Sequence, residues 1–225
     1  MAYEYKSKDG ENIRICVFHM THIENLPSIF EEGGLLSSNE MIRRELKYAD
    51  VGSGSITERR NENLLKCHLP ARVRVNDCVP FYFRARSKML SHLHFKKAKA
   101  KNYDPLYGQN NVVFLCYDLE EIIVWSEKVR NLWAFTDKNA GNKQNNFYSY
   151  SDDSHFYKLD WDRILNWGDR SESTQAEFLV EGFVGNKCVE EIVVKNHRAQ
   201  DKALKYLSGI TDVPTVTIDT SFYFE

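Results

Sequence analysis

The sequence has few of the features that would cross-link the chain, anchor it in a membrane or direct its export. Its five cysteines are an odd number without a Cys-X-X-Cys pair, which argues against a disulfide framework and favours a reducing compartment. No apolar run reaches the roughly 18 residues of a membrane-spanning helix. The start, MAYEYKSKDGENIR, is polar and charged, unlike a signal peptide. We therefore expect a cytoplasmic protein without a membrane contact.

An excess of charge of one sign is also missing. The chain has 30 Lys and Arg against 32 Asp and Glu, a net charge of −2, so a nucleic-acid contact requires a local basic patch. There is no phosphate-binding Walker loop and no GxGxxG motif. His and Cys are scattered without the spacing of a zinc motif, so no metal is expected. The 42% of hydrophobic residues in 225 suits one globular domain and excludes wholesale disorder.

Short strand and helix patterns alternate without a repeat. The patterns predict strands at 13–19, 71–75, 78–83, 112–118, 131–136, 176–180, 191–194 and 213–218. They predict helices at 23–34, 160–167 and 200–207, and a helical turn at 119–124. Pro80 indicates an edge or a bulge in its strand. The polar stretch 137–154 is a long loop, and such loops are often functional. The whole suggests a mixed α+β domain.

The most basic part of the chain runs from Arg84 to Lys101. It holds seven positive charges and no Asp or Glu, and Phe81, Tyr82 and Phe83 come directly before it. Phosphates bind positive charge, and unpaired bases stack on flat rings, so this segment suits single-stranded nucleic acid. A solvated helix face is the alternative, and the charge run alone does not decide between them.

Two further positions place polar groups on predicted strands. His19 and Thr21 are two residues apart at a strand exit, so their side chains share a face and could bind a polar ligand. Hydrogen bonds of purely structural use are the alternative. Glu177 begins an otherwise apolar strand, where a carboxylate must be either paired or used. A salt bridge at a strand edge is the alternative there.

Four segments, taken in order, resemble the DarT family, the DNA ADP-ribosyltransferase toxins of DarT–DarG toxin–antitoxin systems. The segments are FHMTHIENLPSIFEEGGLL (18–36), SITERR (55–60), VPFYFRARSKML (79–90) and QAEFLV (175–180). The resemblance implies a single α+β domain over 1–225, with the PARP-like ADP-ribosyltransferase fold and a central split β-sheet. It implies NAD as co-substrate, with ADP-ribose transferred to a base of single-stranded DNA and nicotinamide released.

The resemblance also implies roles for individual residues. Glu177 matches the catalytic glutamate, and the catalytic arginine falls on Arg59 or Arg60. The residues that match NAD-binding positions are His19, Thr21, Asn25 and Tyr82.

Two DNA contacts are inferred from the residues themselves. The basic stretch would bind the DNA backbone through Arg84, Arg86, Lys88, Lys96 and Lys97. The long loop 137–154 would recognise the acceptor base with aromatic side chains such as Tyr148.

The chain departs from the family pattern in two places. Many members have RSPMLY where this chain has Lys88 and Ser91, and DGHA where it reads Asp137-Lys138-Asn139-Ala140. The second segment lies in the loop expected to choose the acceptor base, so thymine and guanine both stay open as targets. An ADP-ribosyltransferase acting on RNA or protein, and a catalytically silent single-strand-binding module, are the alternative functions. The resemblance also implies a DarG-like macrodomain antitoxin as partner and a role in phage defence.

Overall fold

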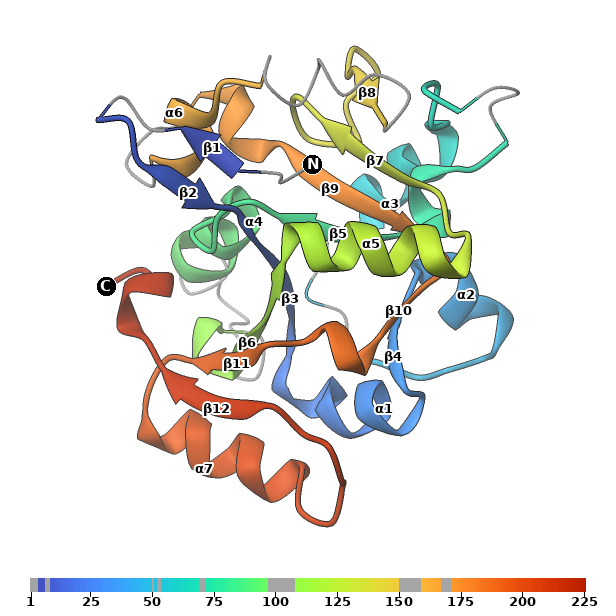
Figure 1. Ribbon diagram of the computed structural model, residues 1–225. Helices are drawn as coiled ribbons and strands as arrows, with labels where there is room; N and C mark the ends of the chain where they lie inside the picture. The colour runs from blue at the N-terminus through green and yellow to red at the C-terminus, as the bar shows by residue number, and fades with distance from the viewer. Residues whose placement is uncertain are drawn as a thin grey trace.

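An eight-stranded sheet organises the molecule, in the order β12-β11-β6-β3-β5-β9-β7-β8 (Figure 1). The computed structural model describes residues 4–6, 9–49, 51, 54–68, 72–96, 108–149, 159–166 and 171–225. The strands of the sheet are β3 (Cys16–His22), β5 (Cys78–Tyr82), β6 (Val112–Asp118), β7 (Trp133–Thr136), β8 (Phe147–Tyr148), β9 (Glu177–Glu181), β11 (Glu191–Val194) and β12 (Thr215–Ile218). Two small antiparallel pairs flank it, β1 (Glu4–Lys6) with β2 (Asn12–Arg14), and β4 (Gly34–Leu36) with β10 (Phe183–Gly185).

The helices are short and lie around this sheet. They are α1 (Leu26–Glu31), α2 (Ser38–Arg43), α3 (Gly54–Glu62), α4 (Lys88–Ser91), α5 (Leu119–Val129), α6 (Trp161–Leu165) and α7 (His197–Tyr206). Figure 1 shows α5 lying across the middle of the sheet and α7 beside β12. No helix in the described part of the chain has the length and apolar character needed to cross a membrane.

The sheet is split between β3 and β5. β3 pairs with β6 along its whole length, and β5 pairs with β9 along its whole length. Within these described strands, however, β3 and β5 share the single pair Phe18–Tyr82. In Figure 1, β3 runs down the picture while β5 lies across it. The expected α+β fold with a central split sheet is thereby confirmed, and the split places β5 and β9 at the centre of the molecule.

Both faces of the sheet are covered, which the composition of β6 explains. Every residue of β6 is buried, and its side chains alternate between the faces. Val113, Leu115 and Tyr117 join the largest hydrophobic cluster, while Phe114 and Cys116 join a second one. A strand that is apolar on both faces must lie inside a sheet and not at its rim.

Pro80 does not lie at an outer edge, because β5 is an inner strand. Its carbonyl accepts a hydrogen bond from the His19 ring on the side that faces β3. The N–H that proline lacks would point the same way, beyond the single Phe18–Tyr82 pair. The split therefore lets an inner strand contain a proline.

Most predicted elements are present, with two corrections. The predicted strand 71–75 is reduced in its described part to a single β-bridge of Arg74 with Leu64. Val75–Asp77 form a 3-10 turn instead, which Asp77 closes by accepting from the backbone N–H of Arg74. The predicted helix 23–34 is a 3-10 turn followed by α1. Pro27 lies in the first turn of α1, where a backbone N–H has no hydrogen-bond partner within the helix, so its absence costs nothing. Gly33 then ends the segment at a φ of +79°, a conformation that favours glycine. The predicted turn 119–124 is the start of the longer helix α5. All five cysteines are free.

Candidate active site

One row of residues crosses the sheet at the split. Tyr82 of β5 pairs with Phe18 of β3 on one side and with Glu177 of β9 on the other. Residues directly opposite one another on neighbouring strands have side chains on the same face of the sheet. The strand register therefore places Tyr82 and Glu177 next to each other, although 95 positions separate them in the sequence.

Glu177 is the most deeply buried acid of the site, with no exposed surface. Burying an unpaired carboxylate costs several kcal/mol, so its charge needs partners. Arg60 Nη1 donates to both carboxylate oxygens, at 3.1 Å to Oε1 and 2.8 Å to Oε2. The backbone N–H of Ala140 donates to Oε1 at 2.9 Å. Glu177 is thus held by one cation and one backbone donor.

The structure places Arg60, and not Arg59, against the glutamate. Arg59 is exposed, whereas the Arg60 side chain is 11% exposed and lies on the inner face of α3. Burial lowers the pKa of Arg60, but the Glu177 carboxylate, helped by smaller effects of Tyr82 and Cys78, raises the pKa above its usual value. Arg60 Nη2 is buried and has no hydrogen-bond partner among the described residues. A charged donor is therefore left over beside the glutamate.

The backbone of Glu177 is fixed by Thr136, the last residue of β7. The Glu177 N–H donates to Thr136 Oγ1 at 2.7 Å, and this hydroxyl donates in turn to the carbonyl of Lys138 at 2.7 Å. Thr136 is wholly buried. The Thr136 hydroxyl therefore links the start of β9 to the start of the loop that contains Ala140.

Tyr82 of this row and His19, the residue after Phe18 on β3, are neutral polar groups. Burial and the nearby Glu177 charge raise the pKa of Tyr82, so its hydroxyl stays protonated. Burial lowers the pKa of His19 to about 4, against a smaller opposing effect of the Pro80 carbonyl. His19 Nδ1 lies 2.9 Å from that carbonyl, which only accepts, so Nδ1 carries the proton. Nε2 of the neutral ring is then a hydrogen-bond acceptor.

Thr21 and Asn25 are joined to the loop that leads to α3. Asn25 Nδ2 donates to Thr21 Oγ1 and to the carbonyl of Ala49, both at 3.0 Å. Asn25 Oδ1 accepts from the N–H of Ala49 at 2.8 Å. In the described contacts these two residues hold the chain ahead of α3, the helix that carries Arg60.

The predicted DNA-binding residues are not gathered on one described surface. Arg84 is 4% exposed and donates to the carbonyl of Asn166 at 3.1 Å, so it belongs to the interior and the expectation of a surface contact is corrected. The chain turns inward there, since the next residue, Ala85, is wholly buried. Arg86 lies over the ring of Phe224, and Lys88 is exposed on α4.

Three expectations fall on or near the undescribed parts of the chain. Lys97 and residues 150–154 of the long loop lie outside the described residues, and so does the side chain of Lys96. Tyr148 is half-buried in β8 and packs against the main hydrophobic cluster.

Sequence reasoning missed two residues of the site, Thr136 and Ala140. Ala140 acts through its backbone, which leaves no side-chain signal. The sequence contained one clue: of the DGHA segment of the family, residues 137–140 keep only the first and last residues, Asp137 and Ala140. The polar loop residues Asn139 and Asn142 form local turns by accepting from the N–H groups of Gly141 and Gln144.

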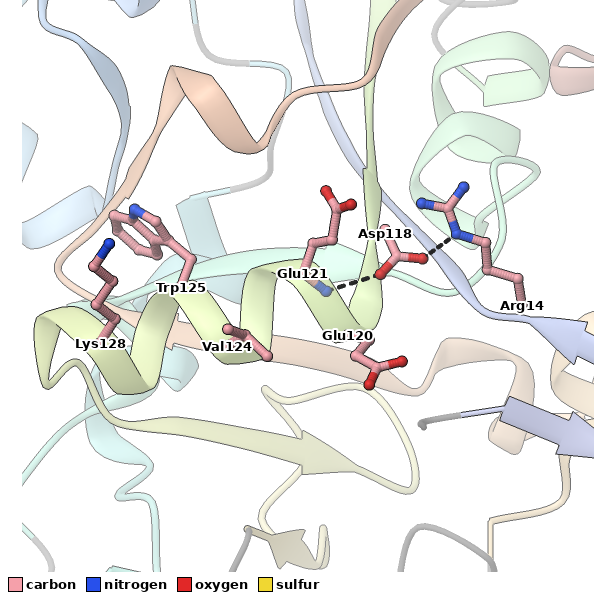
Figure 2. Close-up of a pocket in the computed structure, with 7 residues that line it drawn as sticks. All are labelled: Arg14, Asp118, Glu120, Glu121, Val124, Trp125 and Lys128. Carbon is pink, nitrogen blue, oxygen red and sulfur yellow. Dashed lines mark hydrogen bonds and ion pairs between the residues drawn. The ribbon is translucent and has the colours of Figure 1, made fainter. Parts of the chain in front are cut away.

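Two cavities differ in their relation to this site. A cavity of about 310 Å³ adjoins it, between the end of α3 and the loop, and is lined by Glu62, Asn63, Leu64, Lys66, Asn142, Lys143 and Phe147. A larger cavity of about 540 Å³ lies along α5, where Figure 2 shows Arg14 against Asp118, which also caps the helix by accepting from the Glu121 N–H. None of the site residues described above lines either cavity. In the described part of the chain, no group of three or more His, Cys, Asp or Glu side chains is placed to hold a metal ion.

Comparison with known proteins agrees with this geometry. The family model described as "ssDNA thymidine ADP-ribosyltransferase, DarT" matches residues 18–224. A DNA ADP-ribosyl transferase of Thermus sp. (strain 2.9) is 30% identical, over 92% of this chain and 95% of that protein. One of Thermus aquaticus is 29% identical, over 93% of this chain and 89% of that protein.

Solved structures show the same fold. Thermus sp. 2.9 DarT in complex with ADP-ribosylated ssDNA matches with a TM-score of 0.78 and 27% identity, over 94% of this chain and 97% of that one. The same protein in complex with NAD+ matches with a TM-score of 0.73 and 26% identity, over 94% and 98%. The chain described here therefore belongs to the DarT family of single-stranded-DNA ADP-ribosyltransferases.

Proposed function

We propose that this protein transfers ADP-ribose from NAD to a thymine or guanine base of single-stranded DNA, with Glu177 and Arg60 as its catalytic residues. The observation that carries the proposal is the fully buried Glu177 carboxylate, paired with Arg60 at the split of the sheet. A buried structural acid would also need a cation, but Arg60 has in addition a donor, Nη2, without a partner among the described residues. Related DarT structures contain NAD+ and ADP-ribosylated ssDNA, which supports both substrates.

The two oxygens of Glu177 differ in what they can do. Oε1 accepts from Ala140 N–H and Arg60, whereas Oε2 accepts from Arg60 alone among the described residues. Oε2 is thus the oxygen free to hold a ribose hydroxyl or to take the proton of an attacking base. NAD supplies the ADP-ribosyl group, and cleavage of its glycosidic bond develops positive charge on the ribose. The Glu177 carboxylate would stabilise that charge.

Arg60 has two tasks in this proposal. Through Nη1 it supplies the counter-charge that a buried Glu177 carboxylate needs. Through the unpartnered Nη2 it would bind a phosphate oxygen or a base carbonyl. Because a guanidinium stays charged at every working pH, both tasks persist across the pH range in which the enzyme operates.

Tyr82, His19, Thr21 and Asn25 would form and support the NAD site. His19 Nε2 would accept a hydrogen bond from a ribose hydroxyl, since Nδ1 is committed to Pro80. Tyr82 would wall the nicotinamide end next to Glu177. Thr21 and Asn25 would act by holding the segment before α3 in place.

The DNA contact is proposed for the remainder of the basic segment. Lys88, Arg86, Lys96 and Lys97 would bind the DNA backbone, and Tyr148 would contribute an aromatic face beside the loop. Arg84 is left out of this surface because its guanidinium is buried.

A DarG-like macrodomain antitoxin is the proposed protein partner, within a toxin–antitoxin system. A relative of Thermosipho africanus is described as a fusion of a DNA ADP-ribosyl transferase and a DNA ADP-ribosyl glycohydrolase. It is 25% identical over 92% of this chain and 49% of its own length, so this chain spans about half of it. The pairing of opposite activities in one relative supports a partner that reverses the modification.

The test is incubation with NAD and a mixed-sequence single-stranded oligonucleotide, read by intact mass. Wild type should add one ADP-ribose to the DNA, and Glu177→Ala should add none. Fragmentation of the product then names the base, for which thymine is favoured by the description of the family and guanine is the alternative. Loss of NAD without a DNA adduct would favour an RNA or protein acceptor. DNA binding with intact NAD would favour a silent binding module.

A further inference from the structure

Asn63 lies between the helix that carries Arg60 and the loop that contacts Glu177. It is the first residue after α3 and is half-buried. Its Nδ2 donates to the carbonyl of Ala140 at 2.8 Å and to the carbonyl of Asn142 at 3.3 Å. One side-chain amide therefore bridges α3 to two backbone groups of the loop.

Ala140 connects this amide to the carboxylate. Its N–H donates to Glu177 Oε1 at 2.9 Å, while its carbonyl accepts from Asn63. Ala140 is wholly buried, so water cannot replace either bond. Because both groups belong to Ala140, a displacement of this residue away from Asn63 also moves its N–H away from Glu177 Oε1.

Asn63 is itself held firmly. Its carbonyl accepts from the Val75 N–H at 2.9 Å, and the next residue, Leu64, forms a β-bridge with Arg74. The other described polar link between this end of α3 and the loop is the ion pair of Lys143 with Glu62. Both side chains of that pair are more than half exposed, at 70% and 62%, and exposed ion pairs contribute little. Asn63 therefore carries most of the connection.

We propose that Asn63 is a positioning residue that sets the Ala140 N–H against Glu177 Oε1 and so keeps Oε2 directed at the substrate. This inference rests on the function proposed above. Without the Asn63 amide, the loop loses its fixed distance from α3, and Oε1 loses its backbone donor. The carboxylate then turns between two orientations, and the contact needed in the transition state weakens more than NAD binding does.

The first test measures the structure alone. Amide hydrogen exchange of Ala140, read by NMR, should be faster by about tenfold or more in Asn63→Ala than in wild type. The matched control is Asn61→Ala, which alters an exposed asparagine in the last turn of α3 whose Oδ1 accepts from Asn39. Ala140 exchange should stay at its wild-type rate in the control. Unchanged exchange in Asn63→Ala would overturn the inference.

The second test separates positioning from packing. Asn63→Asp keeps the size of the side chain but removes both N–H donors, so it should fail as Asn63→Ala does. Both variants should lower kcat by about 10- to 100-fold while the KM for NAD stays within about threefold. A wild-type kcat in either folded variant, or a loss that falls mainly on KM, contradicts the proposal.

The two tests also keep this inference apart from the proposed function. If wild type and Asn61→Ala transfer no ADP-ribose to DNA, the proposed function fails, and Ala140 exchange still decides whether Asn63 holds the loop. If both transfer normally and Asn63→Asp does too, the positioning role alone is wrong.

Discussion

Arg60 Nη1 lies 2.8 Å from Oε2 of Glu177, and this ion pair joins α3 to the start of β9 inside the protein. The pair spans 117 positions of sequence and both partners are almost completely shielded from water. A buried pair of this kind contributes little net stability while it is intact, but either charge alone is costly. The pair is therefore weak evidence for stability, which agrees with the catalytic role proposed for it.

The first prediction follows from that cost. Arg60→Ala should lower the free energy of unfolding by about 3 to 5 kcal/mol, because it leaves the Glu177 carboxylate buried without its cation. Arg59→Ala, on the exposed face of the same helix, should change it by no more than about 0.5 kcal/mol. Urea denaturation of the two variants measures both values. Equal effects of the two substitutions would contradict the assignment of Arg60 to the pair.

The second prediction concerns activity. Glu177→Gln keeps the shape of the side chain but removes the charge and the base, so ADP-ribose transfer should fall by about 10²- to 10⁴-fold. Glu172→Gln is the control, since that acid is 70% exposed and precedes the same strand. Single-turnover transfer to an oligonucleotide gives both rates. A Glu177→Gln rate within tenfold of wild type would remove Glu177 from the reaction.

The sequence predicted the strands better than it predicted the contacts between distant segments. Apolar runs such as Val112–Asp118 identify a buried strand because hydrophobicity is a local property. The choice between Arg59 and Arg60 depends on which face of α3 meets β9, and local sequence does not contain that information. Ala140 escaped notice because a backbone N–H is the same in every non-proline residue. The prediction for Arg84 was wrong because a charged side chain suggests an exposed position, whereas the chain around Arg84 turns into the interior.

The third prediction concerns the hydroxyl that fixes the backbone of Glu177. Thr136→Val keeps the shape of the side chain and removes the acceptor of the Glu177 N–H, leaving a buried donor unpaired. The free energy of unfolding should fall by about 1 to 3 kcal/mol. Thr215→Val, an exposed threonine of β12, should be neutral within about 0.5 kcal/mol. If urea denaturation gives Thr136→Val the same free energy of unfolding as that control, the Glu177 N–H does not need the Thr136 hydroxyl as its acceptor.

The fourth prediction tests the close approach of β4 to β10. A Cβ added at Gly34 would lie 2.1 Å from the carbonyl oxygen of Val184 and 2.8 Å from the ring of Phe183. The backbone contact cannot be relieved by a rotamer change, so Gly34→Ala should separate the pair and destabilise the protein by more than about 1 kcal/mol. Gly185→Ala, whose added Cβ would meet only the Trp125 ring at 3.5 Å, should be much milder. Thermal unfolding ranks the two, and equal melting temperatures would contradict the register of this pair.

The last prediction uses the neutral state of His19. Its pKa is about 4 in the folded protein against an ordinary value of 6.5, so between these values the unfolded chain binds a proton that the folded protein does not. The contribution of His19 to the free energy of unfolding is therefore fully present above pH 6.5 and is lost as the pH falls toward 4. Between pH 7 and pH 5 it should amount to about 2 kcal/mol of unfolding free energy.

His19→Gln should remove this part of the pH dependence, because an amide does not titrate in that range. The control is His197→Gln, an exposed histidine at the start of α7, which should keep the wild-type slope between pH 7 and pH 5. Urea denaturation at both pH values in all three proteins gives the comparison. If His19→Gln retains the full slope, the His19 ring titrates in the folded protein as it does in the unfolded chain, and Nε2 then stops being an acceptor below pH 6.5. The same measurement therefore decides the stability effect and the pH range in which Nε2 can accept a ribose hydroxyl.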